Sequence, residues 1–348
     1  MRIFAPMNTE RSHFSGLLLA WYAQNGRDLP WRQTRDPYRV WVSEIILQQT
    51  RVAQGYDYFL RFVERFPTVE ALAGATEDEV LRLWQGLGYY SRARNLHKAA
   101  RQVVEMGGFP TEYEGIRSLK GVGDYTAAAI ASLAFGLPYA VVDGNVYRVL
   151  SRYFGIDVPI DSTEGRKLFA AMARELLDAR RPADYNQAIM DFGALQCTPK
   201  SPDCMACPLT DTCQARAEGR VEQWPVKQHV TRVRDRYFTY VYVRCEGYAL
   251  LQRRGSGDIW QGLYQPPLWE TGRPMTLREL QEQVGTYGTL QLLRSHVVHQ
   301  LTHQRLHAQF YLLDCLRRLP LEGVWVAERE VGNGYAVPRL VEELLACL

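Results

Sequence analysis

Four of the seven cysteines in this 348-residue chain fall within one short run, ALQCTPKSPDCMACPLTDTC. The spacing C-x6-C-x2-C-x5-C places them at Cys197, Cys204, Cys207 and Cys213. The N-terminus lacks the apolar stretch of a secretory signal, so we expect a cytoplasmic protein whose clustered thiols stay reduced and bind a metal. Only Cys204 and Cys207 form the close pair typical of zinc sites, whereas an iron–sulfur cluster suits more widely spread ligands. The spacing therefore favours an iron–sulfur cluster, with zinc and reduced structural thiols as the alternatives.

Two carboxyl groups lie where folding would change their acidity. Glu44 lies in the apolar segment VWVSEIILQQT, which predicts a helix. Burial there would raise the pKa of a carboxyl group and let it hold a proton near neutral pH. Asp143 follows the apolar run YAVV and precedes Gly144 and Asn145, at the expected start of another helix. A solvent-exposed glutamate and a helix N-cap aspartate are the ordinary alternatives for these two positions.

The elements that must position these groups change character near residue 216. Before it, apolar residues follow a helical period, as in DEVLRLWQGLGYYSRARNLHKAARQVVEMGG, with a break at Gly86 and Gly88. After residue 235, RYFTYVYVRCEGYALLQRR predicts two strands about a turn at Glu246–Gly247, and AQFYLLDCL predicts another strand. We therefore expect an all-α region at 1–215, a polar and basic linker at 216–235 and an α+β domain at 236–348.

Charge and hydropathy assign no partner by themselves. Lys and Arg number 41 against 38 Asp and Glu, so the net charge of +3 permits nucleic-acid binding without arguing for it. The longest apolar run, AAAIASLAFGLPYAVV, contains Gly136 and Pro138 and is too short to span a bilayer. No membrane association is expected.

A second local pattern, LKGVGDYTAAAI, predicts a tight turn between two helices. Gly121 and Gly123 allow the backbone to turn and to present its N–H groups at the start of the following helix. Such donors stabilise an anion such as a DNA phosphate, and Lys120 adds a positive charge beside them. An ordinary turn between helices fits the same residues equally well.

Several segments, taken together, resemble the base-excision DNA glycosylases. LKGVGDYTAAAI is similar to their helix–hairpin–helix motif, VVDGNVYRVLSR to the segment with their essential aspartate, and the cysteine run to their [4Fe-4S] loop. LPWR, VWVSEIILQQT and WQGLGYYSRARNL resemble the MutY-type adenine DNA glycosylases in particular. The resemblance covers nearly all of residues 14–215. It implies a six-helix barrel and a cluster-bearing helical domain, with DNA and the active site in the cleft between them.

The resemblance implies a monofunctional enzyme that removes adenine from double-stranded DNA, where adenine is paired with 8-oxoguanine or with G. We expect a monomer. Cleavage of a glycosidic bond suits two carboxyl groups, one as an acid and one that stabilises a cationic sugar. Glu44 would protonate adenine at N7 and help to activate water, and Asp143, oriented by Asn145, would stabilise the cation. Tyr125 stands where the glycosylase/lyases of the superfamily carry a lysine, so no Schiff base is expected.

The same resemblance implies two groups of DNA-contacting residues, because the target base must leave the helix stack. The expected adenine pocket contains Trp31, Arg32 and Gln187. The expected strand-inserting residues are Gln49 and Tyr89, which are favoured over Gln48. Core packing is the ordinary alternative for the two aromatic residues.

The second domain resembles the Nudix-like C-terminal domain of the MutY family, beginning at GDIWQGLYQPP. A Nudix hydrolase holds Mg²⁺ through glutamates on one helix. Gln283 replaces one such glutamate and Tyr264 replaces the opening glycine, although ETGRPMTLRELQEQVG retains Glu270, Arg278, Glu279 and Glu282. We therefore expect no nucleotide hydrolysis.

The segment HQLTHQRLH resembles the loop with which the family probes 8-oxoguanine opposite adenine. Thr302 and His303 match its polar pair, whereas Leu301 replaces the usual Phe. Three alternative functions stay open: a glycosylase/AP lyase for oxidised pyrimidines, a nucleotide-pyrophosphate hydrolase run by the second domain, and a non-catalytic iron–sulfur protein that binds DNA.

Overall fold

The computed structural model describes residues 8–229 and 233–348 of the chain. The described residues form two compact units, one within Met1–Ala73 and Lys98–Val230 and the other within Gly74–His97 and Thr231–Leu348. The second unit thus combines the C-terminal domain with a segment from the helical half of the sequence. Residues 1–7 of the expected first domain and 230–232 of the expected linker lie outside the described residues. The boundaries that the sequence places at 215 and 235 stay a prediction.

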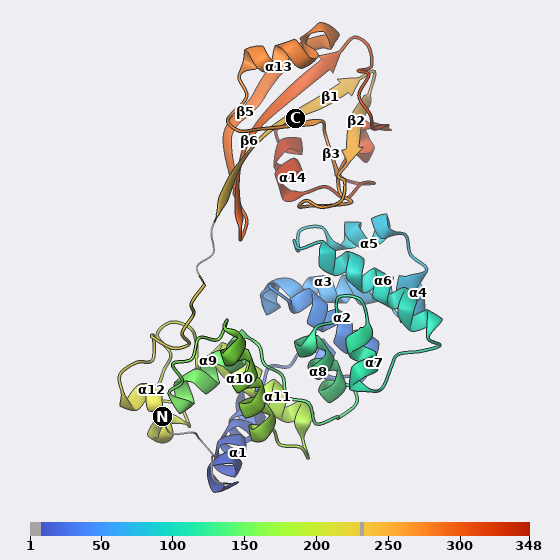
Figure 1. Cartoon of the computed structure of the whole chain (residues 1–348). Helices are drawn as coiled ribbons and strands as arrows, with labels where there is room; N and C mark the ends of the chain where they lie inside the picture. Colours follow the sequence, from blue (N-terminus) through green and yellow to red (C-terminus); the bar gives the residue numbers. More distant parts are fainter. Residues whose placement is uncertain (1–7, 230–232) are drawn as a thin grey trace. The chain divides into compact units, whose positions relative to one another are not determined.

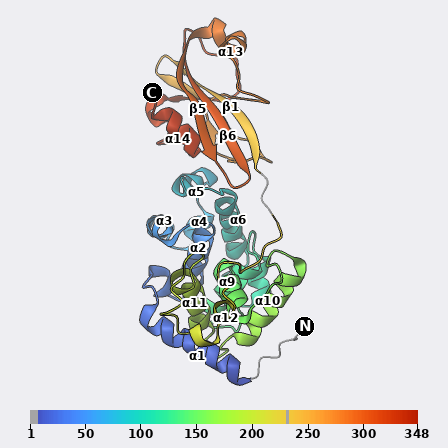
Figure 2. The same ribbon diagram turned by 90° about the vertical axis from the view of Figure 1, so that its left-hand side faces the viewer.

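The first unit is built from helices and their connections (Figures 1 and 2). Its elements are α1 (Asn8–Asn25), η1 (Pro30–Arg32), α2 (Pro37–Leu47), α3 (Val52–Arg65), α4 (Val69–Ala73), α7 (Tyr113–Ser118), α8 (Asp124–Leu133), α9 (Gly144–Phe154), α10 (Thr163–Leu176), α11 (Pro182–Asp191), η2 (Phe192–Gln196), η3 (Thr210–Thr212) and α12 (Gln214–Ala217). α6 (Ser91–Glu105) begins in the second unit and ends in the first. The described residues before 230 contain no strand, so the expectation of an all-α region is confirmed for them.

The helical period of the apolar residues explains how these helices pack. On α9, Val146, Val149 and Leu150 recur at helical spacing and are buried in one apolar cluster with Phe14 and Leu18 of α1. Each such buried side chain contributes roughly 1.5–3 kcal/mol relative to its exposed state. α1 also packs on α10 and α11, so the first helix of the chain is held by elements far along the sequence.

The predicted turn between two helices is present between α7 and α8. Gly121 has a φ of 79°, in the left-handed region that favours glycine, and Gly123 is the N-cap of α8. Arg117 braces the turn, because its Nη1 donates to the backbone oxygen of Val122 at 3.1 Å. The hairpin therefore has a defined turn, and its exposed residues Gly121, Gly123 and Asp124 lie at the start of α8.

The second unit contains α5 (Glu77–Trp84), the start of α6 and a sheet whose described strands number seven. The strands are β1 (Arg234–Cys245), β2 (Tyr248–Arg253), β3 (Tyr264–Gln265), β4 (Leu268–Thr271), β5 (Gly288–Gln300), β6 (Gln304–Cys315) and β7 (Val324–Ala327). The order is β3-β2-β1-β6-β5, with β4 paired to β1 and β7 paired to β2. β1 and β6 run parallel, with Arg234 beside Gln304, and β5 is antiparallel to β6.

Alternation along the central strands places helices on both faces of this sheet (Figures 1 and 2). Phe238 and Tyr240 of β1 belong to the apolar cluster that includes α14 (Arg339–Leu345). Val241 and Val243 belong to the opposite cluster, which includes α13 (Leu277–Val284). The predicted turn at Glu246–Gly247 is confirmed, and both of its residues have a positive φ, as tight hairpins require.

Two features of this unit were not anticipated from the sequence. The segment HQLTHQRLH is mostly strand, because Gln304–His307 pairs with the start of β1 and with the end of β5, so that only Leu301–His303 forms a turn. β5 itself was not predicted. Its polar and apolar residues alternate with irregularities at Leu292–Arg294 and Arg294–Val297, which weaken the period of two.

No helix among the described residues is long and apolar enough to cross a bilayer.

Candidate active site

Glu44 lies on the buried face of α2. Its neighbours in the helix, Val40, Val42 and Ile45, are core residues, and Glu44 itself is only 8% exposed. Burial raises the pKa of the Glu44 carboxyl to about 7, and repulsion from the carboxylate of Asp143 adds to this increase. A carboxyl group with this pKa holds and releases a proton at neutral pH, as a general acid must.

The hydroxyl of Tyr125, on α8, donates a hydrogen bond to Oε2 of Glu44 at 2.9 Å. This bond stabilises the ionised carboxylate and so opposes the increase in the pKa of Glu44. Burial, followed by the nearby carboxylates, raises the pKa of Tyr125 well above its usual value, so the hydroxyl keeps its proton. Tyr125 therefore acts here as a hydrogen-bond donor, and a phenol cannot form an imine with a sugar.

Asp143 is the N-cap of α9. Its Oδ1 accepts a hydrogen bond from the backbone N–H of Val146 at 2.8 Å, and its Oδ2 accepts one from Nδ2 of Asn145 at 2.7 Å. Arg148 fixes that amide in turn, because its Nη2 donates to Oδ1 of Asn145 at 2.8 Å. Burial raises the pKa of Asp143, and the bonds from Val146 and Asn145 oppose the rise. The two roles expected for Asp143, helix cap and site carboxylate, are thus compatible in one geometry.

Glu44 and Asp143 line one cavity of about 730 Å³ in the first unit. The cavity lies between residues of the 27–52 segment and residues of the 125–199 segment. It brings together eight residues that the sequence marked as site residues: Trp31, Arg32, Glu44, Gln49, Tyr125, Asp143, Asn145 and Gln187. Long-range packing has therefore assembled a site from positions that are scattered in the sequence.

The wall of the cavity combines aromatic, cationic and amide groups. Trp31 is 7% exposed and packs edge-on against Phe59, so it is a core residue that also faces the cavity. Oε1 of Gln187 accepts a hydrogen bond from the hydroxyl of Tyr22 at 2.5 Å, which leaves the amide N–H₂ as a donor. Arg32 also lines the cavity, and its guanidinium is paired with Asp191. These groups suit the flat face and polar edge of a nucleobase.

Arg27 also lines this cavity, and Asp191 pairs with Arg27 and with Arg32; neither residue was predicted. The side chain of Asp191 is fully buried, and its oxygens accept hydrogen bonds from Arg32 at 2.6 and 2.8 Å and from Nε of Arg27 at 2.9 Å. Burial alone would raise the pKa of Asp191, but the bonds from Arg32 and Arg27 outweigh it and lower the pKa. The only local signal was an acidic residue in the otherwise apolar context AIMDFG.

The predicted phosphate-binding residues Lys120, Gly121 and Gly123 lie outside the cavity, in the hairpin between α7 and α8. The side chain of Lys120 is exposed, and its backbone N–H bonds to Oε1 of Gln102 at 2.8 Å. The hairpin thus presents a cation at a fixed turn.

The four clustered cysteines lie close enough to influence one another electrostatically. Burial raises the pKa of Cys207 to about 11, and the other three thiols add to this increase. Arg152 holds the loop, because its guanidinium bonds to the backbone oxygens of Thr198 and Pro199 and lies 3.4 Å from Sγ of Cys197. Within the described part of the chain, no three His, Cys, Asp or Glu side chains are arranged to hold a single metal ion. Four thiols in one loop match the ligand type of an iron–sulfur cluster, and a [4Fe-4S] cluster at this loop stays a prediction.

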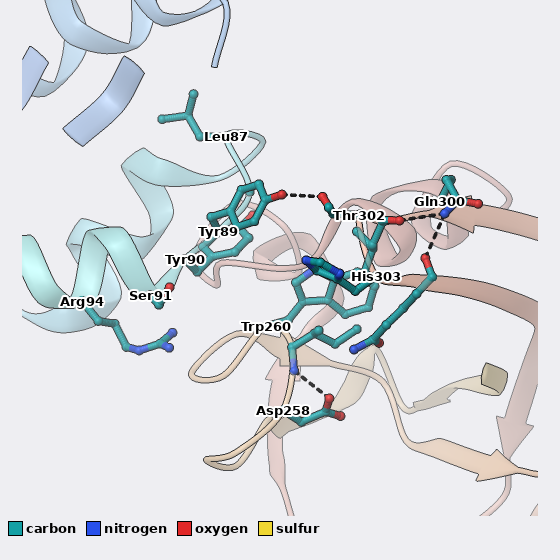
Figure 3. Close-up of a pocket in the computed structure, with 14 residues that line it drawn as sticks. Leu87, Tyr89, Tyr90, Ser91, Arg94, Asp258, Trp260, Gln300, Thr302 and His303 are labelled. Carbon is teal, nitrogen blue, oxygen red and sulfur yellow. Dashed lines mark hydrogen bonds between the residues drawn. The ribbon is translucent and has the colours of Figure 1, made fainter. Parts of the chain in front are cut away.

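The remaining predicted residues, Tyr89, Thr302 and His303, lie in the second unit and line a separate cavity of about 410 Å³ (Figure 3). The hydroxyls of Tyr89 and Thr302 are 2.5 Å apart. Tyr89 has a φ of 47° and Gln49, in the first unit, a φ of 59°. Both expected strand-inserting residues therefore have a left-handed backbone conformation. This conformation is uncommon for residues other than glycine and is found often at functional sites.

The glutamates of the Nudix-like segment are paired with arginines. Glu270 accepts bonds from Arg236 at 2.6 and 2.7 Å. Glu279 accepts from Arg273 and also closes a capping box with Thr276. Glu282 lies 3.3 Å from Arg278. Their charges are therefore satisfied within the domain.

Comparisons with known proteins agree with this architecture. Residues 42–174 match the family described as HhH-GPD superfamily base excision DNA repair protein, and residues 239–347 match the NUDIX domain family. The solved structure of a thermostable thymine-DNA glycosylase is 32% identical with a TM-score of 0.57, over 61% of this chain and 98% of that chain. A non-covalent endonuclease III–DNA complex, at 21% identity and a TM-score of 0.54, shares the fold over 62% of this chain and 98% of its own.

Among curated relatives, the adenine DNA glycosylase of Buchnera aphidicola subsp. Acyrthosiphon pisum (strain APS) is 34% identical over 343 residues, which are 95% of this chain and 96% of the relative. The human adenine DNA glycosylase is 48% identical over 225 residues, which are 62% of this chain. The match spans only 41% of the human protein.

The helical fold and the two-carboxyl cavity define a base-excision DNA repair protein of the helix–hairpin–helix superfamily with a Nudix-like C-terminal domain. Within that superfamily, the family of this chain is shown by the adenine DNA glycosylases that it matches over 75% and 96% of their length. The chain belongs to the adenine DNA glycosylases, a family of DNA N-glycosylases.

Proposed function

We propose that the chain removes adenine from DNA at A:8-oxoguanine and A:G pairs and leaves an intact abasic strand. The observation that carries this proposal is that two carboxyl groups, the buried Glu44 and the half-buried Asp143, line one cavity, and that the pKa of Glu44 is raised to about 7. Glu44 donates a proton to adenine at N7, which makes the base a better leaving group. The C1′–N9 bond breaks, and both of its electrons go to adenine.

Asp143 stabilises the cationic sugar that this cleavage produces. Its hydrogen bonds from Val146 and Asn145 favour the ionised form and oppose the effect of burial. We assign Glu44 as the protonated acid and Asp143 as the charged stabiliser. The ionised Glu44 then takes a proton from the water that attacks C1′. Tyr125 has no amine with which to form a Schiff base, which is the observation that supports monofunctional chemistry over the lyase alternative.

Recognition of the DNA would be shared among several surfaces. The α7–α8 hairpin, with Lys120, Gly121 and Gly123, suits a backbone phosphate. Trp31, Arg32 and Gln187 suit the extruded adenine. Gln49 and Tyr89 would fill the space that the base leaves in the stack.

Two further parts complete the proposal. Cys197, Cys204, Cys207 and Cys213 would hold a [4Fe-4S] cluster that orders the loop of residues 198–203 for contact with the DNA backbone. Thr302 and His303 would read the base opposite adenine, since a hydroxyl and an imidazole can pair with the N7–H donor and O8 acceptor of 8-oxoguanine.

The test is a single-turnover incubation with duplexes that contain one A:8-oxoguanine, A:G, A:T or T:G pair. We expect free adenine from the first two, a faster reaction with the first, and strand cleavage only after alkali. The T:G duplex is included because a solved relative is a thymine-DNA glycosylase. Release of thymine but no adenine would overturn the adenine assignment. Strand cleavage before alkali, with borohydride trapping on DNA, would instead favour a lyase.

A further inference from the structure

We propose that Trp260 determines specificity, by positioning the turn Leu301–His303 that reads the base opposite adenine. This inference rests on the proposed function of that turn. It concerns a residue of a different loop, which connects β2 to β3 and lines the same cavity as Thr302 and His303 (Figure 3).

The backbone at Trp260 is strained. Its φ is 60°, a left-handed conformation that is an outlier for a bulky aromatic residue. Glycine would adopt this φ without steric cost, so the conformation alone does not explain a tryptophan at this position. A strained residue persists where its surroundings fix it, and such residues cluster at ligand sites.

The surrounding loop fixes Trp260 on both sides. Nε of Arg254 donates to the backbone oxygen of Ile259 at 2.9 Å, and the N–H of Leu263 donates to the backbone oxygen of Trp260 at 3.0 Å. Asp258 accepts the N–H of Ile259 at 2.7 Å and also pairs with Arg254 at 2.6 Å. The tight bonding of the loop leaves the indole with a defined place in the cavity wall.

The indole packs against the strand that leads into the turn. Its ring lies 6.0 Å from the ring of His299 on β5 and 6.5 Å, edge-on, from that of Phe238 on β1. Trp260 and Leu301 are both partly buried and pack against the same apolar cluster. The indole thus supports the turn at Leu301, where the family's usual Phe is replaced by a smaller side chain.

A second link joins the loop to the other end of the turn. Nη1 of Arg236 donates to Asp258 at 2.7 Å and to Oε1 of Gln304 at 2.9 Å, so one buried guanidinium spans the loop and the first residue of β6. Backbone bonds then close the turn, from Leu301 N–H to the oxygen of Gln304 at 2.8 Å. The exposed side chains of Thr302 and His303 are therefore presented from a backbone that Trp260 and Arg236 hold on either side.

Removal of the indole should let the turn move without any change to the two-carboxyl cavity, which lies in the other unit. The test uses the full chain and compares Trp260→Gly, which suits the backbone but lacks the ring, with Trp260→Phe, which keeps an aromatic ring. Single-turnover adenine release is measured on A:8-oxoguanine and A:G duplexes. A matched control is Trp325→Ala, because Trp325 packs in the cluster on the opposite face of the sheet.

We expect Trp260→Gly to lower the preference for A:8-oxoguanine over A:G by at least about 5-fold, the lower end of the effect of a mismatched base contact. The rate constant on A:G should stay within about 2-fold of the wild type, since a positioning residue acts on the contact that discriminates. Trp260→Phe should restore most of the preference. Trp325→Ala should keep it.

Wild-type preference in Trp260→Gly, or an equal loss of preference in Trp325→Ala, would overturn the inference. If Trp260→Gly does not fold by circular dichroism, Trp260→Asn replaces it, because asparagine tolerates a left-handed backbone. If the wild type releases no adenine from either duplex, the proposed function fails first and the inference is rejected with it. If the wild type prefers A:8-oxoguanine over A:G and Trp260→Gly shows the same preference, the inference is rejected while the proposed function stands.

Discussion

Glu44 and Tyr125 form the smallest unit in which function can be tested, a carboxyl group and the hydroxyl that tunes it. A general acid must be protonated, so single-turnover adenine release should fall as the pH rises through about 7, the pKa of Glu44. Tyr125→Phe removes a hydrogen bond that favours the ionised carboxylate. The pKa of Glu44 should therefore rise further, and the fall in rate should move to higher pH. An unchanged pH profile in this variant would show that Glu44 is not the acid whose titration is observed.

Replacement of Glu44 should lower the rate of adenine release and should also change how the free energy of unfolding depends on pH. Glu44→Gln keeps the shape but cannot donate the proton, so a loss of at least about 10²-fold in single-turnover rate is expected. The folded pKa of Glu44 is raised from 4.5 to about 7, so the native state binds this proton more tightly than the unfolded chain. The associated stability is present below pH 4.5 and is lost as the pH rises through about 7.

The free energy of unfolding of the wild type, relative to Glu44→Gln, should therefore fall by up to about 3 kcal/mol between pH 4 and pH 8. Urea unfolding at the two pH values measures this difference. The exposed Glu105→Gln is the matched control, and it should change neither rate nor pH dependence. A relative stability that does not depend on pH would contradict the burial of an ionisable Glu44.

At the scale of elements, Asp143 joins chemistry to the start of a helix. Asp143→Asn keeps an acceptor for the N–H of Val146, so α9 should keep its cap while the charge that stabilises the sugar cation is lost. Asp143→Ala should lose the charge and the cap together, with a cost of about 0.5–2 kcal/mol in unfolding free energy. Both variants should be inactive, but only the alanine variant should melt early. Equal melting temperatures would mean that the cap contributes nothing.

The hairpin between α7 and α8 makes an electrostatic prediction. If Lys120 contacts a DNA phosphate, Lys120→Ala should weaken duplex binding equally for every base pair tested. The slope of log affinity against log salt should shrink by about 1. Lys167→Ala, an exposed lysine on α10, is the matched control. A salt slope identical to that of the wild type would remove Lys120 from the interface.

Local patterns in the sequence predicted those features of the structure that are determined by residues close together in the chain. The apolar helix around Glu44, the cap at Asp143 and the turn at Gly121 were all accessible, because period, capping and backbone freedom act over a few residues. The salt bridges of Asp191 with Arg27 and Arg32 join residues 164 and 159 apart, and only the folded chain brings them together. The bond between Tyr125 and Glu44 spans 81 residues and was equally inaccessible from local pattern.

At the scale of the whole molecule, residues 74–97 group with the C-terminal domain in one compact unit, which no local pattern in the sequence indicated. Gln85 donates to Glu342 at 2.6 Å, and Arg94 donates to the backbone oxygen of Gln261 at 2.6 Å. Deletion of the C-terminal domain would therefore uncover part of α5 and α6 as well as remove the turn at Thr302. Point variants in the full chain separate these effects, and a deletion does not.

One variant in the full chain can test whether the second unit reads the opposite base while the first unit releases adenine. Thr302→Ala combined with His303→Ala removes the hydroxyl and the imidazole from the exposed turn and leaves its backbone bonds in place. We expect the preference for A:8-oxoguanine over A:G to fall by roughly 5- to 100-fold, while adenine release from A:G stays near the wild-type rate. Single-turnover rates and binding constants on the two duplexes measure both quantities.

Glu44→Gln provides the opposite pattern, because loss of the acid should slow both substrates by the same factor and leave their ratio unchanged. A hydroxyl and an imidazole in the second unit would then set which adenine is chosen, and a carboxyl group in the first would set how fast it leaves. If Thr302→Ala with His303→Ala slows both substrates equally, the turn serves binding or folding in general. The site that reads the opposite base would then have to lie elsewhere on the chain.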